Sequence, residues 1–142
     1  MVTVPFFAPD VPALKKNPLF LYTSDRFERP NAFRADVAVA IDEVMEPTLD
    51  ALLVMESQIH EGGAGGYPGI YPEDSAGRQR RREEVRKDLA RRYAASAEQY
   101  RAALVKYYGA DRAKNVRYAQ AFEICEYGRR PSQEELKQMF PF

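Results

Sequence analysis

The sequence predicts an α/β fold on three observations. Residues 36–41 alternate large apolar residues with alanine, so both faces of the strand they would form are apolar. Such strands lie in sheets covered on both sides, as in a parallel α/β sheet. A helical pattern follows directly at 47–58, which makes half of a βαβ unit. A long amphipathic helix is predicted near 78–108, where apolar residues recur every three to four positions.

The composition fits one soluble globular unit. The 142 residues are enough for a single domain. Lys and Arg together number 21, as do Asp and Glu, so no net charge draws the chain to nucleic acid or to an anionic membrane. Cys125 is the only cysteine, and residues 1–10 lack the basic start of a signal peptide. We expect a cytoplasmic protein with no disulfide and no membrane span.

The first half of the chain alternates irregular and regular segments. Residues 1–18 contain four prolines, which block helix formation and predict an extended arm. The apolar run at 19–23 suits a short buried strand. After the helix at 47–58, the glycines and prolines that begin the segment 62–77 predict a flexible loop. This loop does not have the context of a phosphate-binding loop, because a helix and not a strand precedes it.

The second half carries local stop and start signals. Gly109 is expected to end the long helix. Residues 115–126 alternate with a period of two, which predicts an edge or last strand. Ser132 and Glu135 have the spacing of a capping box and predict the start of a short helix. The apolar end at 139–142 is expected to dock on the fold.

A basic stretch lies in the first half of the long helix. Arg78–Arg92 holds seven Arg and one Lys against three acidic residues. Such a stretch is typical of a solvated helix face with ion pairs between residues four apart. The alternative is a contact with an anion or with nucleic acid, which a single basic helix without interleaved aromatic residues supports only weakly.

The chain lacks the residues of a complete catalytic site. A catalytic zinc ion needs three protein ligands, and the chain has one His and one Cys. His60, at the end of a predicted helix, is more typical of a surface residue, or of one that interacts with the helix C-terminal dipole, than of a catalyst. Cys125 has no His nearby in the sequence and is predicted to be a small buried side chain. We therefore predict that the chain alone is not an active enzyme and holds no metal.

The best candidate site combines two polar segments. Asp25 and Arg26 follow the first predicted strand, where α/β sheets place their ligands. Ser57, Gln58 and His60 lie at the end of the first predicted helix. We predict these five residues to bind substrate. A helix that follows a strand runs back towards the opposite edge of the sheet, so the two segments could also end a helix length apart, about 18 Å.

Three segments of the chain resemble a known family. They read NPLFLYTSDRFERPNAFRADVAVAID at 17–42, MESQ at 55–58 and VRYAQAFEICEYGRRPSQEELKQMFPF at 116–142. Together they are similar to the C-terminal part of the PIG-L (LmbE-like) de-N-acetylases. The resemblance spans nearly the whole chain, and the last segment is its most specific piece.

The resemblance implies a fold and an activity. Members of the family have a Rossmann-like fold and use zinc to remove an acetyl group from N-acetylglucosamine-type sugars. Their zinc ligands come from an N-terminal His-Pro-Asp-Asp segment and a later His-containing motif, and this chain has neither. Met55 stands where many members have His, and Gln120 stands where the late strand often has Glu. The resemblance thus implies a partial Rossmann-like sheet that is inactive alone, with zinc expected only in a complete member.

The implied partners follow from the missing half. The chain would bind that N-terminal half or itself, and an N-acetylglucosamine-type molecule if completed. The alternative is a non-catalytic α/β module for binding or oligomerisation that has lost the metal site. Neither a membrane nor nucleic acid is an expected partner.

Overall fold

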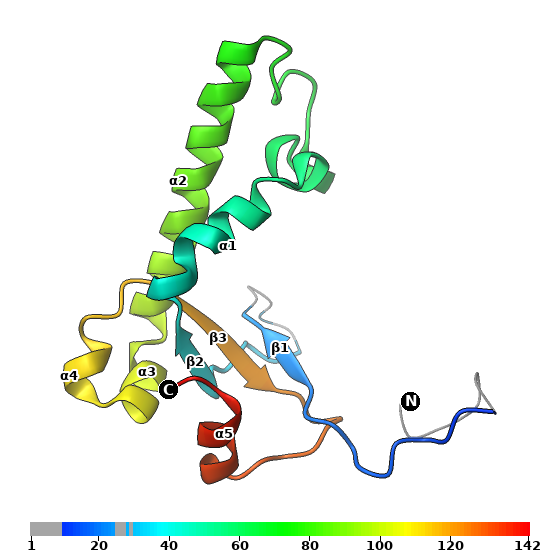
Figure 1. Cartoon of the computed structure of the whole chain (residues 1–142), viewed down its shortest axis with the longest axis vertical. Coiled ribbons are helices and arrows are strands. Elements are labelled where there is room, and N and C mark those ends of the chain that lie inside the picture. The colour runs from blue at the N-terminus through cyan, green and yellow to red at the C-terminus, as the bar shows by residue number, and fades with distance from the viewer. Residues whose placement is uncertain (1–9, 25–27, 29) are drawn as a thin grey trace.

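The computed structural model describes residues 10–24, 28 and 30–142, and these form a mixed α/β fold (Figure 1). Three strands make one small sheet, and their bounds are β1 Leu21–Thr23, β2 Val37–Ala40 and β3 Ala119–Ile124. The strand order is β1-β3-β2, and both pairs are antiparallel. The predicted parallel sheet is therefore wrong in direction. Of the two alternatives predicted for β3, an edge strand or the last strand, only the second is right, because β3 is the last strand along the described chain but is central in the sheet.

The two apolar faces of β2 have a different cause from the one the sequence suggested. On one face, Ala38 and Ala121 of the sheet form a cluster with Ala97 and Leu104 of the long helix. On the other face, Val37 and Val39 pack with Leu136 and with aromatic residues near the C-terminus. Both faces are covered, but by helices and a tail around an antiparallel sheet. Two apolar faces on a strand thus indicate that both faces are covered, but they do not determine whether the strand is parallel or antiparallel to its neighbours.

Strand β1 is an exposed edge strand, although it was predicted to be buried. Tyr22 in its middle is 44% exposed. Two backbone hydrogen bonds join β1 to β3 on either side of the paired residues. Cys125 N–H donates to the Phe20 carbonyl, and Ser24 N–H donates to the Ala121 carbonyl. Residues 10–18 run away from the sheet as an arm, which matches the described part of the predicted arm at 1–18 (Figure 1).

The helices are α1 Met45–Leu52, α2 Ser75–Gln99, α3 Arg101–Tyr108, α4 Ala110–Ala113 and α5 Gln133–Met139. The predicted long helix is present as α2 and α3, and the backbone leaves the helical conformation at Tyr100 (φ −106°, ψ 25°) between them. The backbone bonds through that residue persist, from Tyr100 N–H to Ser96 and from Leu104 N–H to Tyr100. Tyr100 therefore marks a kink, where its ring packs edge-on against Phe33 at 5.6 Å.

The ends of these helices follow local rules. Asp74 accepts a bond from Gly77 N–H over 2.7 Å, so α2 begins at Ser75, earlier than predicted. Gly109, with a φ of 76°, ends α3 as predicted. The predicted helix at 47–58 is shorter in the structure, because α1 ends at Leu52 and a π-helical turn follows at Glu56–His60.

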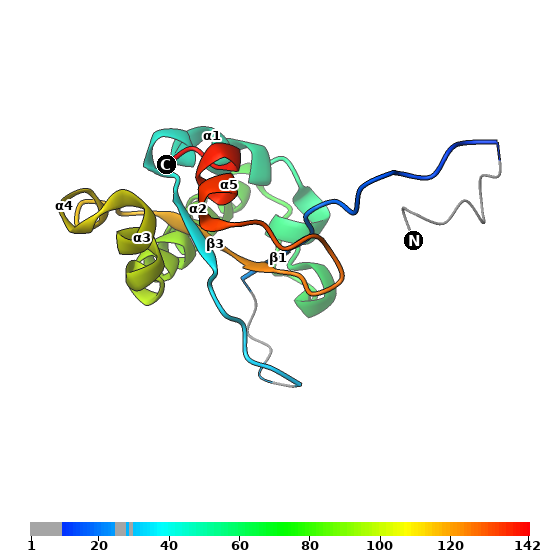
Figure 2. The ribbon, with the colours of Figure 1, turned by 90° about the horizontal axis from the view of Figure 1, so that it is seen from below.

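The C-terminal predictions are confirmed. Ser132 and Glu135 form a reciprocal capping box at the start of α5. The apolar tail docks on the sheet side, with Phe142 stacked on Tyr107 at 4.3 Å between ring centroids. Figure 2 shows α1 and α5 on one side of the strands and α3 on the other. Among the described residues, none of the helices has both the length and the apolar character that a membrane crossing requires.

Candidate functional site

The segment that carries Ser57 and Gln58 is held by His60. After α1, the π-helical turn Glu56–His60 closes with a bond from Glu61 N–H to the Glu56 carbonyl over 3.0 Å. His60 is only 2% exposed, and its Nε2 lies 2.8 Å from the Leu53 carbonyl. Because a carbonyl only accepts, Nε2 carries the proton in this contact. His60 therefore ties the turn to the end of α1. The surface alternative predicted for His60 is wrong, whereas its contact with a carbonyl at a helix end agrees with the other alternative.

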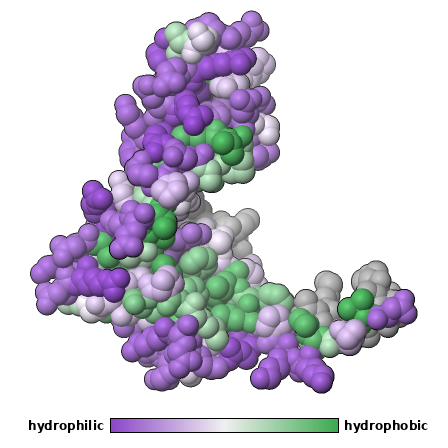
Figure 3. Space-filling model, viewed as in Figure 1, coloured by the Kyte–Doolittle hydropathy of each residue, from purple (hydrophilic) through white to green (hydrophobic). Residues whose placement is uncertain are grey.

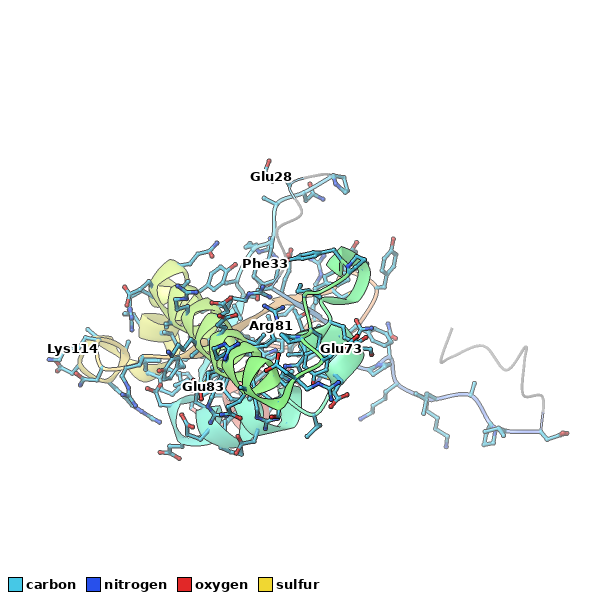
Figure 4. All side chains as sticks on the ribbon, turned by 90° about the horizontal axis from the view of Figure 1, so that it is seen from above. Glu28, Phe33, Glu73, Arg81, Glu83 and Lys114 are labelled. Atoms are coloured by element: carbon cyan, nitrogen blue, oxygen red, sulfur yellow. The ribbon has the colours of Figure 1, made fainter. Side chains whose placement is uncertain are left out.

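Aromatic and cationic groups pack on this turn from two sides. The His60 ring stacks on Tyr71 at 5.5 Å, and the Arg78 guanidinium lies 5.0 Å from the Tyr71 ring centroid. Arg81 donates through Nε to the His60 carbonyl over 3.1 Å. Figure 4 shows Arg81 leaving α2 on the side opposite to Glu83. Part of the basic stretch is thus a structural support for the turn.

A glycine-rich segment completes a hollow beside Ser57 and Gln58. Gly62 and Gly63 have φ of 86° and 56°, a backbone that side chains rarely adopt. A Cβ added to Gly63 would lie 3.1 Å from Oε1 of Gln58, so the glutamine side chain lies over this glycine. A Cβ on Gly66 would meet the Glu61 carbonyl at 2.3 Å, which leaves room only for glycine.

We call this cavity the Gln58 hollow. It has a volume of about 680 Å³, within the range of small-molecule pockets. Tyr67, which is 65% exposed, stands on its rim. The polar and aromatic side chains that line it are Ser57, Gln58, Glu61, Tyr67, Tyr71 and Arg78. This lining offers hydrogen-bond donors and acceptors beside aromatic faces, which is the chemistry that holds a hydroxylated small molecule.

The sequence prediction found part of this lining. Ser57 and Gln58 face the hollow, whereas His60 supports it from the buried side. Tyr67, Tyr71 and Arg78 were not predicted. The signal that could have found the tyrosines is the repeated Tyr-Pro pair within the glycine-rich segment, because such rigid aromatic positions are unusual in a loop that serves only as a connection.

The other predicted site residues, Asp25 and Arg26, lie outside the described residues. Ser24, which precedes them, lines a second cavity of about 570 Å³ beside α2. We call it the Ser96 hollow. The lining side chains described for it do not include Ser57 or Gln58. The other polar and aromatic members of its lining are Asp88, Arg91, Arg92, Ser96, Gln99 and Tyr100.

The donor set does not fit a zinc ion. Within the described ranges, no three His, Cys, Asp or Glu side chains converge. The single imidazole is buried, and its Nε2 is engaged by Leu53. Cys125 is buried, as predicted, and sits at the end of β3. Among the residues that the structure describes, the three ligands of a catalytic zinc are not brought together.

Comparison of the chain with protein-family models, with curated proteins and with solved structures finds no match.

Proposed function

We propose that the chain is the C-terminal, substrate-side part of a PIG-L-like N-acetyl-sugar deacetylase, inactive without the half that carries the metal ligands. The resemblance over segments 17–42, 55–58 and 116–142 motivates this proposal. A complete protein would then have the Rossmann-like sheet of that family, of which the present three strands would be one part. The zinc ion of that complete protein would be held by residues outside this chain.

The observation that carries the proposal is the Gln58 hollow. Ser57, Gln58 and Glu61 offer polar groups in the lining, and the exposed Tyr67 offers a ring face. A sugar has hydroxyl groups at its rim and apolar C–H faces, so it matches both kinds of surface. An N-acetyl group adds an amide that can both donate and accept hydrogen bonds, as the Gln58 amide can.

Apolar surface next to the hollow supports a missing partner. Val54 is 73% exposed and Met55 is 42% exposed, directly before Ser57. Figure 3 shows apolar residues gathered over the sheet, whereas α2 is mostly hydrophilic. Soluble proteins rarely leave large contiguous apolar patches open, so a covering half that reaches over the sheet fits this distribution.

The binding test compares two exposed tyrosines. In 1H-15N correlation spectra, N-acetylglucosamine should shift the amide signals of Ser57, Gln58 and the loop glycines, with weak affinity on the order of 1 mM. Tyr67→Ala should abolish these shifts. Tyr127→Ala, which changes a residue that is 76% exposed and far along the chain, is the matched control and should retain them. Equal loss in both variants, or no shift in the unaltered chain, would contradict the proposal.

The activity test separates binding from hydrolysis. The chain alone, supplied with zinc, should release no acetate from N-acetylglucosamine. Co-expression with the metal-binding half of a PIG-L-type deacetylase should give a complex that releases acetate, and Gln58→Ala should lower that rate. Release of acetate by the chain alone would show that the assignment of the zinc ligands to another half is wrong.

A second candidate function is favoured by the exposed apolar residues themselves. Val11 and Leu14 on the arm are 60% and 53% exposed. A non-catalytic oligomerisation module would bury such residues between copies. The upstream genomic sequence distinguishes the two candidates, because an in-frame His-Pro-Asp-Asp segment favours the deacetylase. Sedimentation velocity adds a direct measurement, since a stable homodimer that never binds sugar would favour the module.

A further inference from the structure

The Ser96 hollow has a lining unlike that of the Gln58 hollow. It lies where β1 ends, between Ser24 and the second half of α2. Arg92, Ser96 and Gln99 lie on one face of that helix, because their spacings of four and three residues bring them onto successive turns, and Arg91 lines the same cavity from the neighbouring position. Two guanidinium groups therefore meet hydroxyl and amide groups in one cavity.

We propose that the Ser96 hollow binds an oxyanion, the phosphate or carboxylate group of a small molecule. Guanidinium groups recognise these groups through paired, charge-assisted hydrogen bonds. The proposal goes beyond the sugar site proposed above, since the two cavities have separate linings among the described residues.

The charges of the basic stretch separate into two sets. Arg78 donates to the Pro72 carbonyl, Arg81 to the His60 carbonyl and Arg82 to the Leu53 carbonyl, over 2.9, 3.1 and 3.5 Å. These arginines, together with Arg86, are engaged in holding the region of α1 and the π-helical turn to α2. The second set at the Ser96 hollow is Arg91 and Arg92, whereas the other two cations of the stretch, Arg80 and Lys87, are not in its lining.

An acidic side chain also lines this hollow. Asp88 pairs with Arg91. The net charge of the lining thus stays positive, because Arg92 forms no ion pair with any side chain in the described part of the chain. The geometry assigns Arg92 the main role in holding an anion, with Arg91 held in position by Asp88.

Uncharged donors complete the site. The Ser96 hydroxyl is shielded from solvent and has no hydrogen-bond partner among the described residues. A buried polar group of this kind normally has a partner, and the hydroxyl would gain one when a ligand displaces the side chains that shield it. Burial raises the pKa of the Tyr100 phenol, which keeps its hydroxyl protonated and able to donate. Ser24 and Gln99 add further donors at the rim.

The test is a titration of the full chain with inorganic phosphate, followed in 1H-15N spectra against sodium chloride of equal ionic strength. The amides of Ser24, Ser96 and Gln99 should shift and saturate, while those of Ser57 and Gln58 should not. Arg92→Ala should weaken phosphate binding by about tenfold, as expected for a hydrogen bond to a charged group. Ser96→Ala should weaken it by roughly threefold. Arg80→Ala changes an exposed arginine of the same helix and should leave the affinity unchanged.

Titrations with other anions identify the kind of group that the Ser96 hollow binds. Acetate and a sugar phosphate distinguish a carboxylate from a phosphate monoester, and saturable binding of either one at Ser96 supports the site. Equal weakening by Arg80→Ala and Arg92→Ala would show a diffuse basic surface and would overturn it. Absence of saturable shifts with all three anions would overturn it as well. Failure of N-acetylglucosamine to bind would leave these results untouched, because that ligand reports on the Gln58 hollow.

Discussion

Arg86 of α2 donates to the Asp50 carboxylate of α1 over 2.7 Å, and its second terminal nitrogen donates to Glu46. One guanidinium therefore joins two successive turns of α1 to α2. Below this pair, Leu49 and Leu53 pack against Val85 and Leu89. The ion pairs lie at the surface, with Asp50 67% and Glu46 76% exposed, so most of the stability of the contact comes from the apolar cluster.

The first prediction concerns this bridge. Arg86→Ala should lower the free energy of unfolding by about 1 kcal/mol, because two exposed ion pairs and the packing of the arginine stem are lost together. Urea denaturation followed by circular dichroism measures the change. The effect should shrink at high salt, since exposed pairs are screened. Arg80→Ala is the control on the same helix, and an equal loss in that variant would contradict the assignment.

The second prediction uses two neighbouring glycines. Gly66→Ala would place a Cβ 2.3 Å from the Glu61 carbonyl, whereas Gly65→Ala would meet nothing within 4 Å. The first substitution must displace the loop that forms the Gln58 hollow, and the second should not. We expect Gly66→Ala to lose N-acetylglucosamine binding in the spectra described above. If Gly65→Ala loses it equally, close backbone approach at Gly66 is not what shapes the hollow.

Local signals predicted the parts of the fold that depend on a few adjacent residues. The Ser132 and Glu135 capping box and the Gly109 stop are confirmed, because each acts within one helical turn. The doubly apolar strand at Val37–Ala40 is confirmed as well. The alternation with a period of two determines which residues share a face, so the two faces can be predicted from the sequence of the strand alone.

Strand direction and order could not be predicted in the same way. The alternation in β3 is equally compatible with an edge or a central position, and the partner strands come from residues about 80 to 100 positions earlier in the chain. The burial of His60 had no local signal either. It depends on the Tyr71 ring and on Arg81, which reach the turn only when α2 packs against α1.

The third prediction is a pH dependence at Asp36. Partial burial raises the pKa of this carboxyl, but hydrogen bonds from Arg34 and from Ile124 N–H, with the charges of Arg34 and Lys106, outweigh it and hold the pKa below its usual value. The unfolded chain then binds a proton more readily, near a pKa of about 3.9. The stabilisation is present above that pH and is lost as the pH falls through the lower folded-state pKa.

Urea denaturation between neutral and acidic pH tests this effect. Asp36→Asn should be less stable than the unaltered chain near neutral pH, and the difference should narrow in the acid range. Asp111→Asn changes a carboxylate whose side chain is fully exposed, and it should retain the pH profile of the unaltered chain. If the free energies of unfolding of Asp36→Asn and of the unaltered chain changed with pH in parallel, the ionisation of Asp36 would not contribute to the pH dependence of stability.

The last prediction distinguishes the two interpretations of His60. If His60 were a surface residue, as its sequence position suggested, His60→Ala would change the free energy of unfolding by less than about 0.5 kcal/mol. The structure instead places the ring in the core, stacked on Tyr71 and bonded to the Leu53 carbonyl. Loss of both contacts and the cavity left behind should cost about 2 to 4 kcal/mol.

His60→Phe separates the two contributions. A phenyl ring can keep the stacking on Tyr71 but cannot donate to Leu53, so its loss of stability should be smaller than that of His60→Ala. Both variants should shift the amide signals of Ser57 and Gln58, because the π-helical turn that carries them is tied to α1 through this side chain. A variant that is destabilised while these signals stay unmoved would show that His60 supports the core without positioning the Gln58 hollow.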